Sequence, residues 1–295
     1  MQRNATGITQ QNGLAAGAYD TVRRTSHDTV RLVSAPQQTI LPPPPELPIS
    51  LLEKRYELKY RVSESTALAL RPFIRNHLEM DKYAIRQPSG QYPICSLYLD
   101  SQRFDLFHET ILDKCNRFKL RVRGYDDNPN SPIFFEIKRK LNRIIFKSRA
   151  KVSKDQLGPI LNGYYIPDDL PEKDHKSLGQ FVHYAQCLQA RPMVLIKYMR
   201  EAYENTSSAK VRVTFDRQLC YQTVDQPIFS LNGGGWKPIP INFVVLEIKF
   251  TAGFPSWLID MVRMFDLSRQ SMSKYCSSVQ PMVPRGAELY TIPRR

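Results

Sequence analysis

The sequence lacks any run of apolar residues close to the about 20 that a membrane-spanning helix needs, although 42% of its 295 residues are hydrophobic. Its N-terminus lacks the basic start and apolar stretch of a secretory signal. Cysteine is scarce, with five widely spaced residues and no Cys-x-x-Cys pair of the kind that binds zinc. These absences predict a cytoplasmic protein in a reducing compartment, without an integral membrane segment.

Acidic residues are few relative to basic ones. The chain has 28 Asp and Glu against 42 Lys and Arg, which gives a formal net charge of +14. A chain this basic is expected to bind a polyanion. Nucleic acid, a phosphorylated small molecule and an anionic membrane surface all fit that charge.

Composition divides the chain into three parts. Residues 1–50 are rich in Gln, Thr, Ala and Ser and end near four consecutive prolines, Pro42 to Pro45. Such a segment buries too little apolar surface to offset its ordering entropy, and the prolines should form a stiff, extended spacer. We therefore predict a disordered or loosely attached Pro-rich arm at 1–50, one large domain at 51–282 and a C-terminal tail at 283–295.

Charged and apolar residues alternate with a period of two from residue 53 onward. Between Arg55 and Val62, every odd position is charged and every even position is apolar or aromatic. In a β-strand this alternation places the charged side chains on one face and the apolar side chains on the other. The pattern recurs at 118–123, 133–140, 144–152, 210–216 and 244–250, and less regularly at 96–100 and 194–203.

About eight half-polar strands without βαβ spacing indicate an antiparallel sheet. A charged face could simply point into solvent, but a solvated sheet usually mixes charges because like charges repel across strands. These faces are mostly cationic. We therefore predict an α+β fold in which an antiparallel closed β-barrel forms a tunnel with a basic lumen. Helices predicted near 63–78, 101–113, 154–161, 176–189 and 255–265 would cover its outside.

A basic lumen suits an extended phosphate chain. Arginine binds phosphate oxygens bidentately, and lysine supplies a movable point charge. Carboxylates in such a lumen would be unfavourable unless they held a divalent cation, so Glu247, Glu57 and Glu136 are candidate ligands for Mn²⁺ or Mg²⁺. Each could instead be the salt-bridge partner of a neighbouring lysine.

Eight short motifs occur in a characteristic order between residues 53 and 279. They are ELKY at 57–60, SLYLDS at 96–101, LRVRGY at 120–125, FEIKRK at 135–140, KYMR at 197–200, VRVTFD at 211–216, LEIK at 246–249 and SKY at 273–275. In these motifs the chain resembles the polyphosphate polymerase domain of the vacuolar transporter chaperone (VTC) complex. That domain belongs to the triphosphate tunnel metalloenzymes, a CYTH-like superfamily with free-standing bacterial members.

The resemblance implies roles for individual basic residues. Those implied to be catalytic are Arg121, Arg123, Lys138 and Arg200. Those implied to hold ATP and the growing chain are Lys59, Lys147, Arg212 and Lys274, with Tyr198 beside them. Lys140 and Arg149 join this set from strand periodicity alone, and Glu247 matches the metal-binding glutamate of the family.

The predicted activity is that of an ATP–polyphosphate phosphotransferase, with ATP and inorganic polyphosphate as partners. Arg55 stands where the superfamily has the first glutamate of a two-glutamate pattern, which favours a polymerase over a triphosphatase. A non-catalytic module that binds polyphosphate or an inositol pyrophosphate is the alternative, together with a triphosphatase of the same fold. Nucleic-acid binding is disfavoured, because the cations alternate with apolar residues instead of forming an open stripe.

Overall fold

The computed structural model describes residues 55–142, 144–205, 210–251, 253–270 and 272–283. The predicted arm and residues 284–295 of the predicted tail lie outside this described part. Within it, no helix is long and apolar enough to cross a membrane. The cytoplasmic location stays a prediction.

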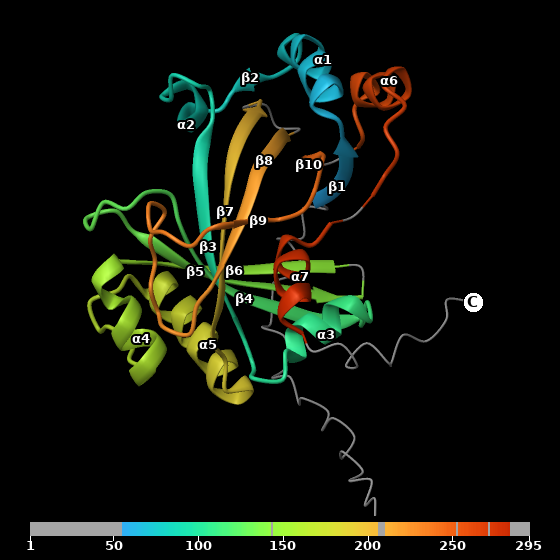
Figure 1. The fold of residues 1–295 in the computed structure, drawn as a ribbon. Coiled ribbons are helices and arrows are strands. Elements are labelled where there is room, and N and C mark those ends of the chain that lie inside the picture. The colour runs from blue at the N-terminus through green and yellow to red at the C-terminus, as the bar shows by residue number, and fades with distance from the viewer. Residues whose placement is uncertain (1–54, 143, 206–209, 252, 271, 284–295) are drawn as a thin grey trace, which may run out of the picture. The chain divides into compact units, whose positions relative to one another are not determined.

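One antiparallel sheet dominates the structure (Figure 1). In order across the sheet its strands are β1 (Arg55–Val62), β10 (Val244–Thr251), β8 (Val211–Thr223), β7 (Arg191–Glu204), β3 (Tyr92–Asp100), β4 (Asn116–Gly124), β5 (Ile133–Leu141) and β6 (Ile144–Val152). Two-residue strands extend it, with β2 (Glu79–Met80) on β7 and β9 (Lys237–Pro238) on β8. The alternating segments of the sequence all form strands, so the prediction of an antiparallel α+β fold is confirmed.

The predicted closure into a barrel is wrong, because β1 and β6 are the two ends of the strand order and do not pair. The polypeptide that follows helix α6 (Ser256–Met264) contacts the free edge of β1. There the Gln270 N–H donates to the Lys59 carbonyl (3.0 Å), and Tyr60 forms an isolated bridge with Arg269. The two sides of the sheet still approach through side chains, since the Lys138 Nζ of β5, the neighbour of the end strand β6, lies 3.2 Å from a Glu57 carboxylate oxygen of β1.

Helices cover the outer, apolar face of the sheet as predicted. α1 (Glu64–Arg75) and α6 (Ser256–Met264) lie over β1 and β10, and α4 (Leu157–Gly163) and α5 (Glu172–Leu188) lie over β5 and β6 (Figure 1). α1 starts at the N-cap Ser63, whose hydroxyl accepts from the Thr66 N–H (3.0 Å). Pro72 lies inside α1 without ending it. The remaining α-helices of the described residues are α2 (Lys82–Ile85), α3 (Asp105–Ile111) and α7 (Lys274–Val279). Two short 3-10 helices lie at Lys154–Gln156 and Gln280–Met282.

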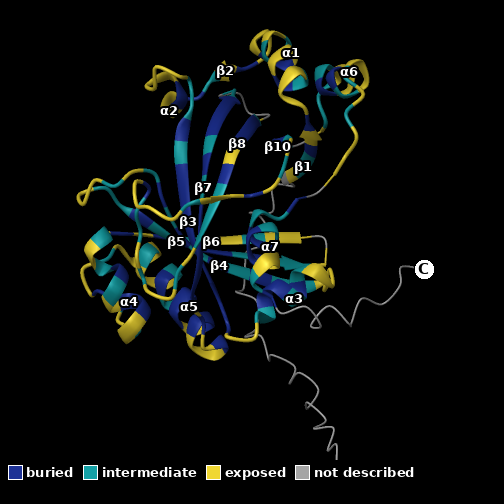
Figure 2. Cartoon of the chain, viewed as in Figure 1, coloured by how far each residue is buried: buried dark blue, intermediate teal, exposed yellow. Residues whose placement is uncertain are grey.

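The concave face of the sheet is not uniformly charged, in contrast to the predicted lumen. Two apolar clusters lie under the outer helices, one against α4 and α5 and one against α1 and α6. A third packs on the inner side of β3 and β7 and includes Ile94, Ile196, Tyr275 and Val279. Figure 2 shows β3 and β7 buried along most of their length. Helix α7 therefore fills the apolar part of the concavity and leaves a charged part beside it.

Candidate anion-binding site

A cavity of about 120 Å³ lies on the concave face, between the ends of the sheet and the start of α7. Eight cationic side chains and two carboxylates line it, together with aromatic and small residues. The lining consists of Glu57, Lys59, Tyr98, Lys119, Arg121, Arg123, Lys138, Tyr198, Arg200, Glu247, Lys249, Met272, Ser273, Lys274 and Tyr275. Such an excess of positive charge in a confined space favours a polyanionic occupant.

Nine of the predicted site residues line this cavity: Glu57, Lys59, Arg121, Arg123, Lys138, Tyr198, Arg200, Glu247 and Lys274. Three more, Glu136, Lys147 and Arg149, form a cluster next to it. The other two lie apart from it. Lys140 pairs with Asp113 (3.6 Å), while Arg212 pairs with Asp81 (2.5 Å) and Glu204 near the end of β8.

Three lysines stand directly opposite one another across neighbouring strands. Lys119 of β4 faces Lys138 of β5, which in turn faces Lys147 of β6. Burial lowers the pKa of each of the three ammonium groups, and neighbouring cations lower it further. Like charges in directly opposite positions destabilise a sheet, so this row is unfavourable for the fold without an anion.

The Lys119 ammonium group donates to the Ser273 hydroxyl at the start of α7 (3.2 Å). No carboxylate of the described residues forms an ion pair with it. The other two lysines of the row do have carboxylate partners, Glu57 for Lys138 and Glu136 for Lys147. Lys119 is therefore the least compensated cation of the row.

Glutamate and lysine alternate between β1 and β10. Glu57 stands opposite Lys249, and Lys59 stands opposite Glu247. The Lys59 Nζ lies 2.9 Å from Glu57 Oε1 and 3.9 Å from Glu247 Oε2, and Lys249 pairs with Glu247. Burial and the Glu247 charge favour neutral Glu57, but Lys59, Lys138 and Lys249 outweigh them and lower its pKa to about 2. Lysines likewise outweigh burial and hold the pKa of Glu247 well below its usual value.

Two ionised carboxylates that share one cation fit a divalent metal. Mg²⁺ in phosphate-transfer sites is commonly bound by one or two carboxylates together with substrate phosphates and water. Glu57 and Glu247 form such a pair, with the Lys59 ammonium group between them. A metal would displace that ammonium group, so the predicted metal role of this pair requires a small movement of Lys59.

Glu136 has a different environment, although the sequence also made it a candidate metal ligand. Its carboxylate is buried among four cations, with Arg121 at 2.7 Å, Lys147 at 2.9 Å, Arg149 at 3.4 Å and Arg123 at 4.0 Å. Burial opposes ionisation, but these cations outweigh it and keep its pKa far below the usual range. This geometry suits a residue that orients Arg121 and Arg123 through ion pairs better than it suits a metal ligand.

Asp216 anchors two further cations from beneath the cavity. Its fully buried carboxylate accepts two hydrogen bonds from Arg200, at 2.7 and 2.8 Å, and lies 2.7 Å from the Lys274 Nζ. Burial opposes its ionisation, yet Arg200 and Lys274 lower its pKa to about 2. Both cations also lie over the Tyr198 ring, at 5.4 and 4.8 Å from its centroid. Their positions are therefore fixed before any ligand binds.

Helix α7 is held in place by a buried tyrosine. The Tyr275 hydroxyl donates to the Asp100 carboxylate, and its ring stacks on Tyr98 with 5.1 Å between centroids. Tyr98 in turn accepts a hydrogen bond from Arg121 (3.2 Å). Burial raises the pKa of the Tyr98 hydroxyl, but Arg121 and Arg123 outweigh it and lower that pKa to about 8.

Six lining residues were not predicted: Tyr98, Lys119, Lys249, Met272, Ser273 and Tyr275. Periodicity could have found two of them. Lys119 shares a strand face with Arg121, and Lys249 follows Glu247 by two positions, so alternation places each beside a predicted residue. Tyr98, Ser273 and Tyr275 stand in recognised motifs, but only the fold brings α7 against β3.

Known proteins similar to this chain were found by sequence and by structure. Subunit 4 of the vacuolar transporter chaperone complex of Schizosaccharomyces pombe is 22% identical over 254 residues, an alignment that covers 70% of this chain. The chain spans about a third (34%) of the length of that relative. Two solved structures are each 12% identical. A "putative adenylate cyclase" from Bacillus halodurans has a TM-score of 0.42 and covers 77% of this chain and 96% of its own. The PH1819 protein from Pyrococcus horikoshii has a TM-score of 0.40, with 77% and 99% covered.

A match to one protein family spans all the residues that the structure describes. Residues 54–283 match the model of the VTC domain. They include every strand of the sheet and all residues that line the cationic cavity. The chain belongs to the VTC domain family.

Proposed function

We propose that this chain makes inorganic polyphosphate, transferring the γ-phosphoryl group of ATP to the end of a chain bound in the cationic cavity. The row of Lys119, Lys138 and Lys147 is the observation that carries this proposal. A row of opposed, partly buried lysines destabilises the empty protein, and a polyanion lying along it would relieve the repulsion. Membership in the VTC family supports phosphate chains as that polyanion.

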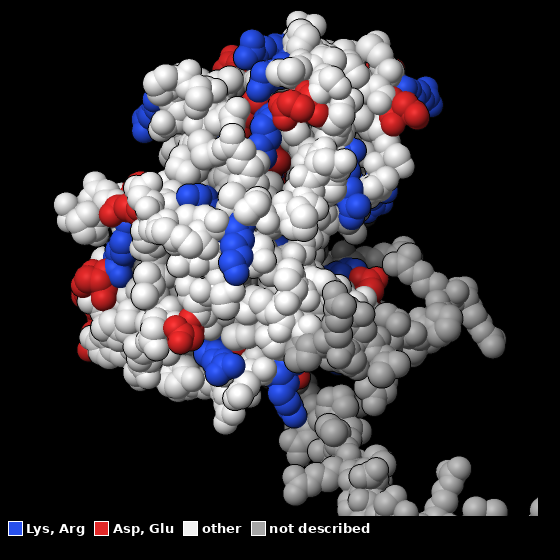
Figure 3. Space-filling view, viewed as in Figure 1, with Lys and Arg blue, Asp and Glu red and all other residues white. Residues whose placement is uncertain are grey.

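The arrangement of cations favours a condensed phosphate chain over nucleic acid. The cations that line the cavity come from β1, β4, β5, β7, β10 and α7, so a narrow anion would meet them from several sides. A duplex would instead contact an open basic surface. On the face drawn in Figure 3, the Lys and Arg side chains of the described residues are scattered among Asp and Glu.

The proposed reaction is an in-line displacement at the γ-phosphorus. An oxygen of the terminal phosphate of the chain forms a bond to the γ-phosphorus, the bond from that phosphorus to the β–γ bridging oxygen breaks, and ADP leaves. Arg121, Arg200 and Lys274 would bind the transferred group, since Glu136 and Asp216 already orient them. Positioning and neutralisation of charge then supply most of the catalysis.

A divalent cation would add positive charge on the triphosphate. Glu57 and Glu247 are the residues that would hold it, together with phosphate oxygens. The lowered pKa values of both groups keep them ionised. The ionised carboxylate is the form that binds a metal. The proposed cofactor is Mn²⁺ or Mg²⁺.

Incubating the purified chain with ATP and Mn²⁺, and staining a gel for polyphosphate, tests the proposal. Arg121→Ala and Lys138→Ala should lose most of the product while circular dichroism and unfolding show an intact fold. Lys176→Ala changes an exposed lysine of α5 outside the cavity and should be as active as the wild type. Normal product formation by the first two variants would contradict the assignment.

A specific observation favours a non-catalytic binding module as the second candidate. No group of three or more His, Cys, Asp and Glu side chains in the described part of the chain could hold a metal ion by itself. A binding module needs the cations and not the metal. Tripolyphosphate binding that persists in EDTA, with no product formed under any metal, would favour this candidate. Competition by duplex DNA would contradict both.

A further inference from the structure

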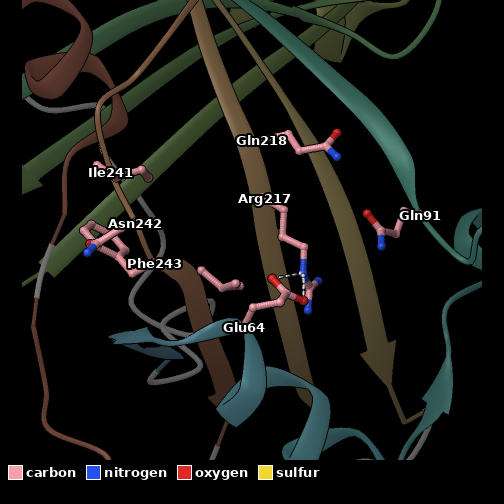
Figure 4. A pocket seen from close by; sticks show the side chains of 8 residues that line it. Glu64, Gln91, Arg217, Gln218, Ile241, Asn242 and Phe243 are labelled. Carbon is pink, nitrogen blue, oxygen red and sulfur yellow. Dashed lines mark hydrogen bonds and ion pairs between the residues drawn. The ribbon is translucent and has the colours of Figure 1, made fainter.

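A second hollow, of about 370 Å³, is lined by residues of β8, of the start of α1 and of the segment that enters β10 (Figure 4). Asp216 and Arg217 are consecutive residues of β8, so their side chains point to opposite faces of the sheet. Asp216 holds Arg200 and Lys274 at the cavity. Arg217 lines the second hollow, and Figure 4 shows it beside Glu64 at the start of α1.

The Arg217 guanidinium group is only partly satisfied. Its Nε donates to both carboxylate oxygens of Glu64, at 2.9 and 3.0 Å, and its Nη1 donates to Glu201 (2.9 Å). Its Nη2 is buried and has no hydrogen-bond partner among the described residues. The side chain of Arg217 is 9% exposed, whereas that of Glu64 is 54% exposed. A buried, charged donor without a partner is unfavourable, so the presence of the unpaired Nη2 needs an explanation.

The geometry of the arginine suggests what the missing partner is. The Nε and Nη2 of a guanidinium group lie on one edge, and a carboxylate or phosphate group can bind that edge with two parallel hydrogen bonds. Glu64 contacts only the Nε of this edge. Because Glu64 is half exposed at the first turn of a helix, its side chain can turn into solvent and leave the whole edge to another oxyanion.

The surroundings of Arg217 add neutral hydrogen-bonding groups and one apolar wall. Figure 4 shows Gln91 and Gln218 on one side of the arginine and Asn242 and Phe243 on the other. Gln218 has a left-handed backbone with φ of 52° and lies where the β7–β8 register shifts. Strained residues at bulges often mark functional sites. The bulge here places an exposed amide at the edge of the hollow.

We propose that this hollow is a second binding site, which takes the carboxylate or phosphate group of a small molecule. The group displaces Glu64 from Arg217 and binds the Nε and Nη2 together, and the amides of Gln91 and Gln218 supply donors to the rest of the molecule. The site is independent of the proposed polymerase activity, because none of these residues lines the cationic cavity.

The Glu64→Gln variant gives the sharpest test. Glutamine can still accept from the Arg217 Nε but no longer competes as an anion, so added anions should bind more tightly. The loss of a half-exposed ion pair predicts about a three- to fivefold gain in affinity. Glu172→Gln, at an exposed position of α5, makes the same change of charge outside the hollow and should have no effect.

The affinity would be measured by calorimetric titration with inorganic phosphate and, separately, with citrate. The full chain would carry Arg121→Ala, which weakens anion binding in the cationic cavity. A gain with Glu64→Gln in the phosphate arm alone identifies a phosphate site, and a gain in the citrate arm alone identifies a carboxylate site. Arg217→Lys keeps the positive charge beside Glu201 but removes the paired Nε and Nη2 donors. It should therefore abolish the gain in anion affinity that Glu64→Gln produces. Unchanged or weaker binding by a folded Glu64→Gln variant in both arms would overturn the proposal.

Discussion

Replacing Lys119 with methionine should stabilise the empty protein and weaken its binding of triphosphate. Lys119 is opposed by Lys138 in the cross-strand row and has no ion-pair carboxylate among the described residues. Methionine keeps most of the length and the apolar character of the lysine stem but removes the charge. The fold then loses this repulsion together with the hydrogen bond from Lys119 to the Ser273 hydroxyl, and a bound polyanion loses a partner.

Both effects can be estimated. Two like charges about 5 Å apart repel by roughly 3 kcal/mol at an effective dielectric constant of about 20. Lys138 is 36% exposed and Lys147 48% exposed, so solvent screens much of this repulsion. A gain of about 1 kcal/mol in the free energy of unfolding is therefore expected. Loss of one hydrogen bond to a charged group, at about 1.5–3 kcal/mol, should weaken triphosphate binding by roughly ten- to a hundredfold.

Urea unfolding of the wild type and of Lys119→Met measures the first effect, and calorimetric titration with tripolyphosphate measures the second. Lys176→Met, on the exposed surface of α5, is the matched control and should change neither quantity by much. A Lys119→Met protein that is less stable than the wild type, with unchanged affinity, would show that the lysine row neither strains the fold nor binds the polyanion.

Three further changes test other parts of the site. Asp216→Asn leaves Arg200 and Lys274 without their buried carboxylate and should lower the free energy of unfolding by about 3–5 kcal/mol; a loss below about 1 kcal/mol in urea unfolding would contradict the anchoring role. Glu247→Gln should abolish the metal stimulation of polyphosphate synthesis, while tripolyphosphate binding in EDTA should be at least as tight as in the wild type because the variant removes a negative charge beside Lys59 and Lys249; stimulation that survives would exclude Glu247 as a ligand. Raising the pH through about 8 should ionise Tyr98, and the new negative charge should weaken tripolyphosphate binding. Titrations at pH 7 and 9 should show a smaller decline for Tyr98→Phe, and equal declines would rule out a contribution from Tyr98.

Much of the sheet could be predicted because its strands are charged on one face and apolar on the other. In β4, for example, Leu120 and Val122 pack under α5 while Arg121 and Arg123 line the cavity. The lack of closure could not be predicted in this way. The edge of β1 is instead contacted by Arg269 and Gln270, which lie far from β1 in the chain and belong to no segment with a regular pattern.

The candidate site was predicted best where single strands supply several cations. Lys140 and Arg212 show the limit of that reasoning, because alternation places a residue on a face but not at a position along it. Their acidic partners, Asp113 and Asp81, come from other elements and hold them away from the cavity. The role of α7 was missed for a related reason, since its six residues are too few to show helical periodicity.

A structure of the chain with tripolyphosphate and Mn²⁺ bound would show whether the cationic cavity holds condensed phosphate. We expect phosphate groups in the cavity of the concave face, in contact with Lys119, Lys138 and Arg200, and the metal between the phosphates and Glu247. A cavity that stays empty at saturating ligand, with tripolyphosphate bound only on the outer surface, would contradict this expectation.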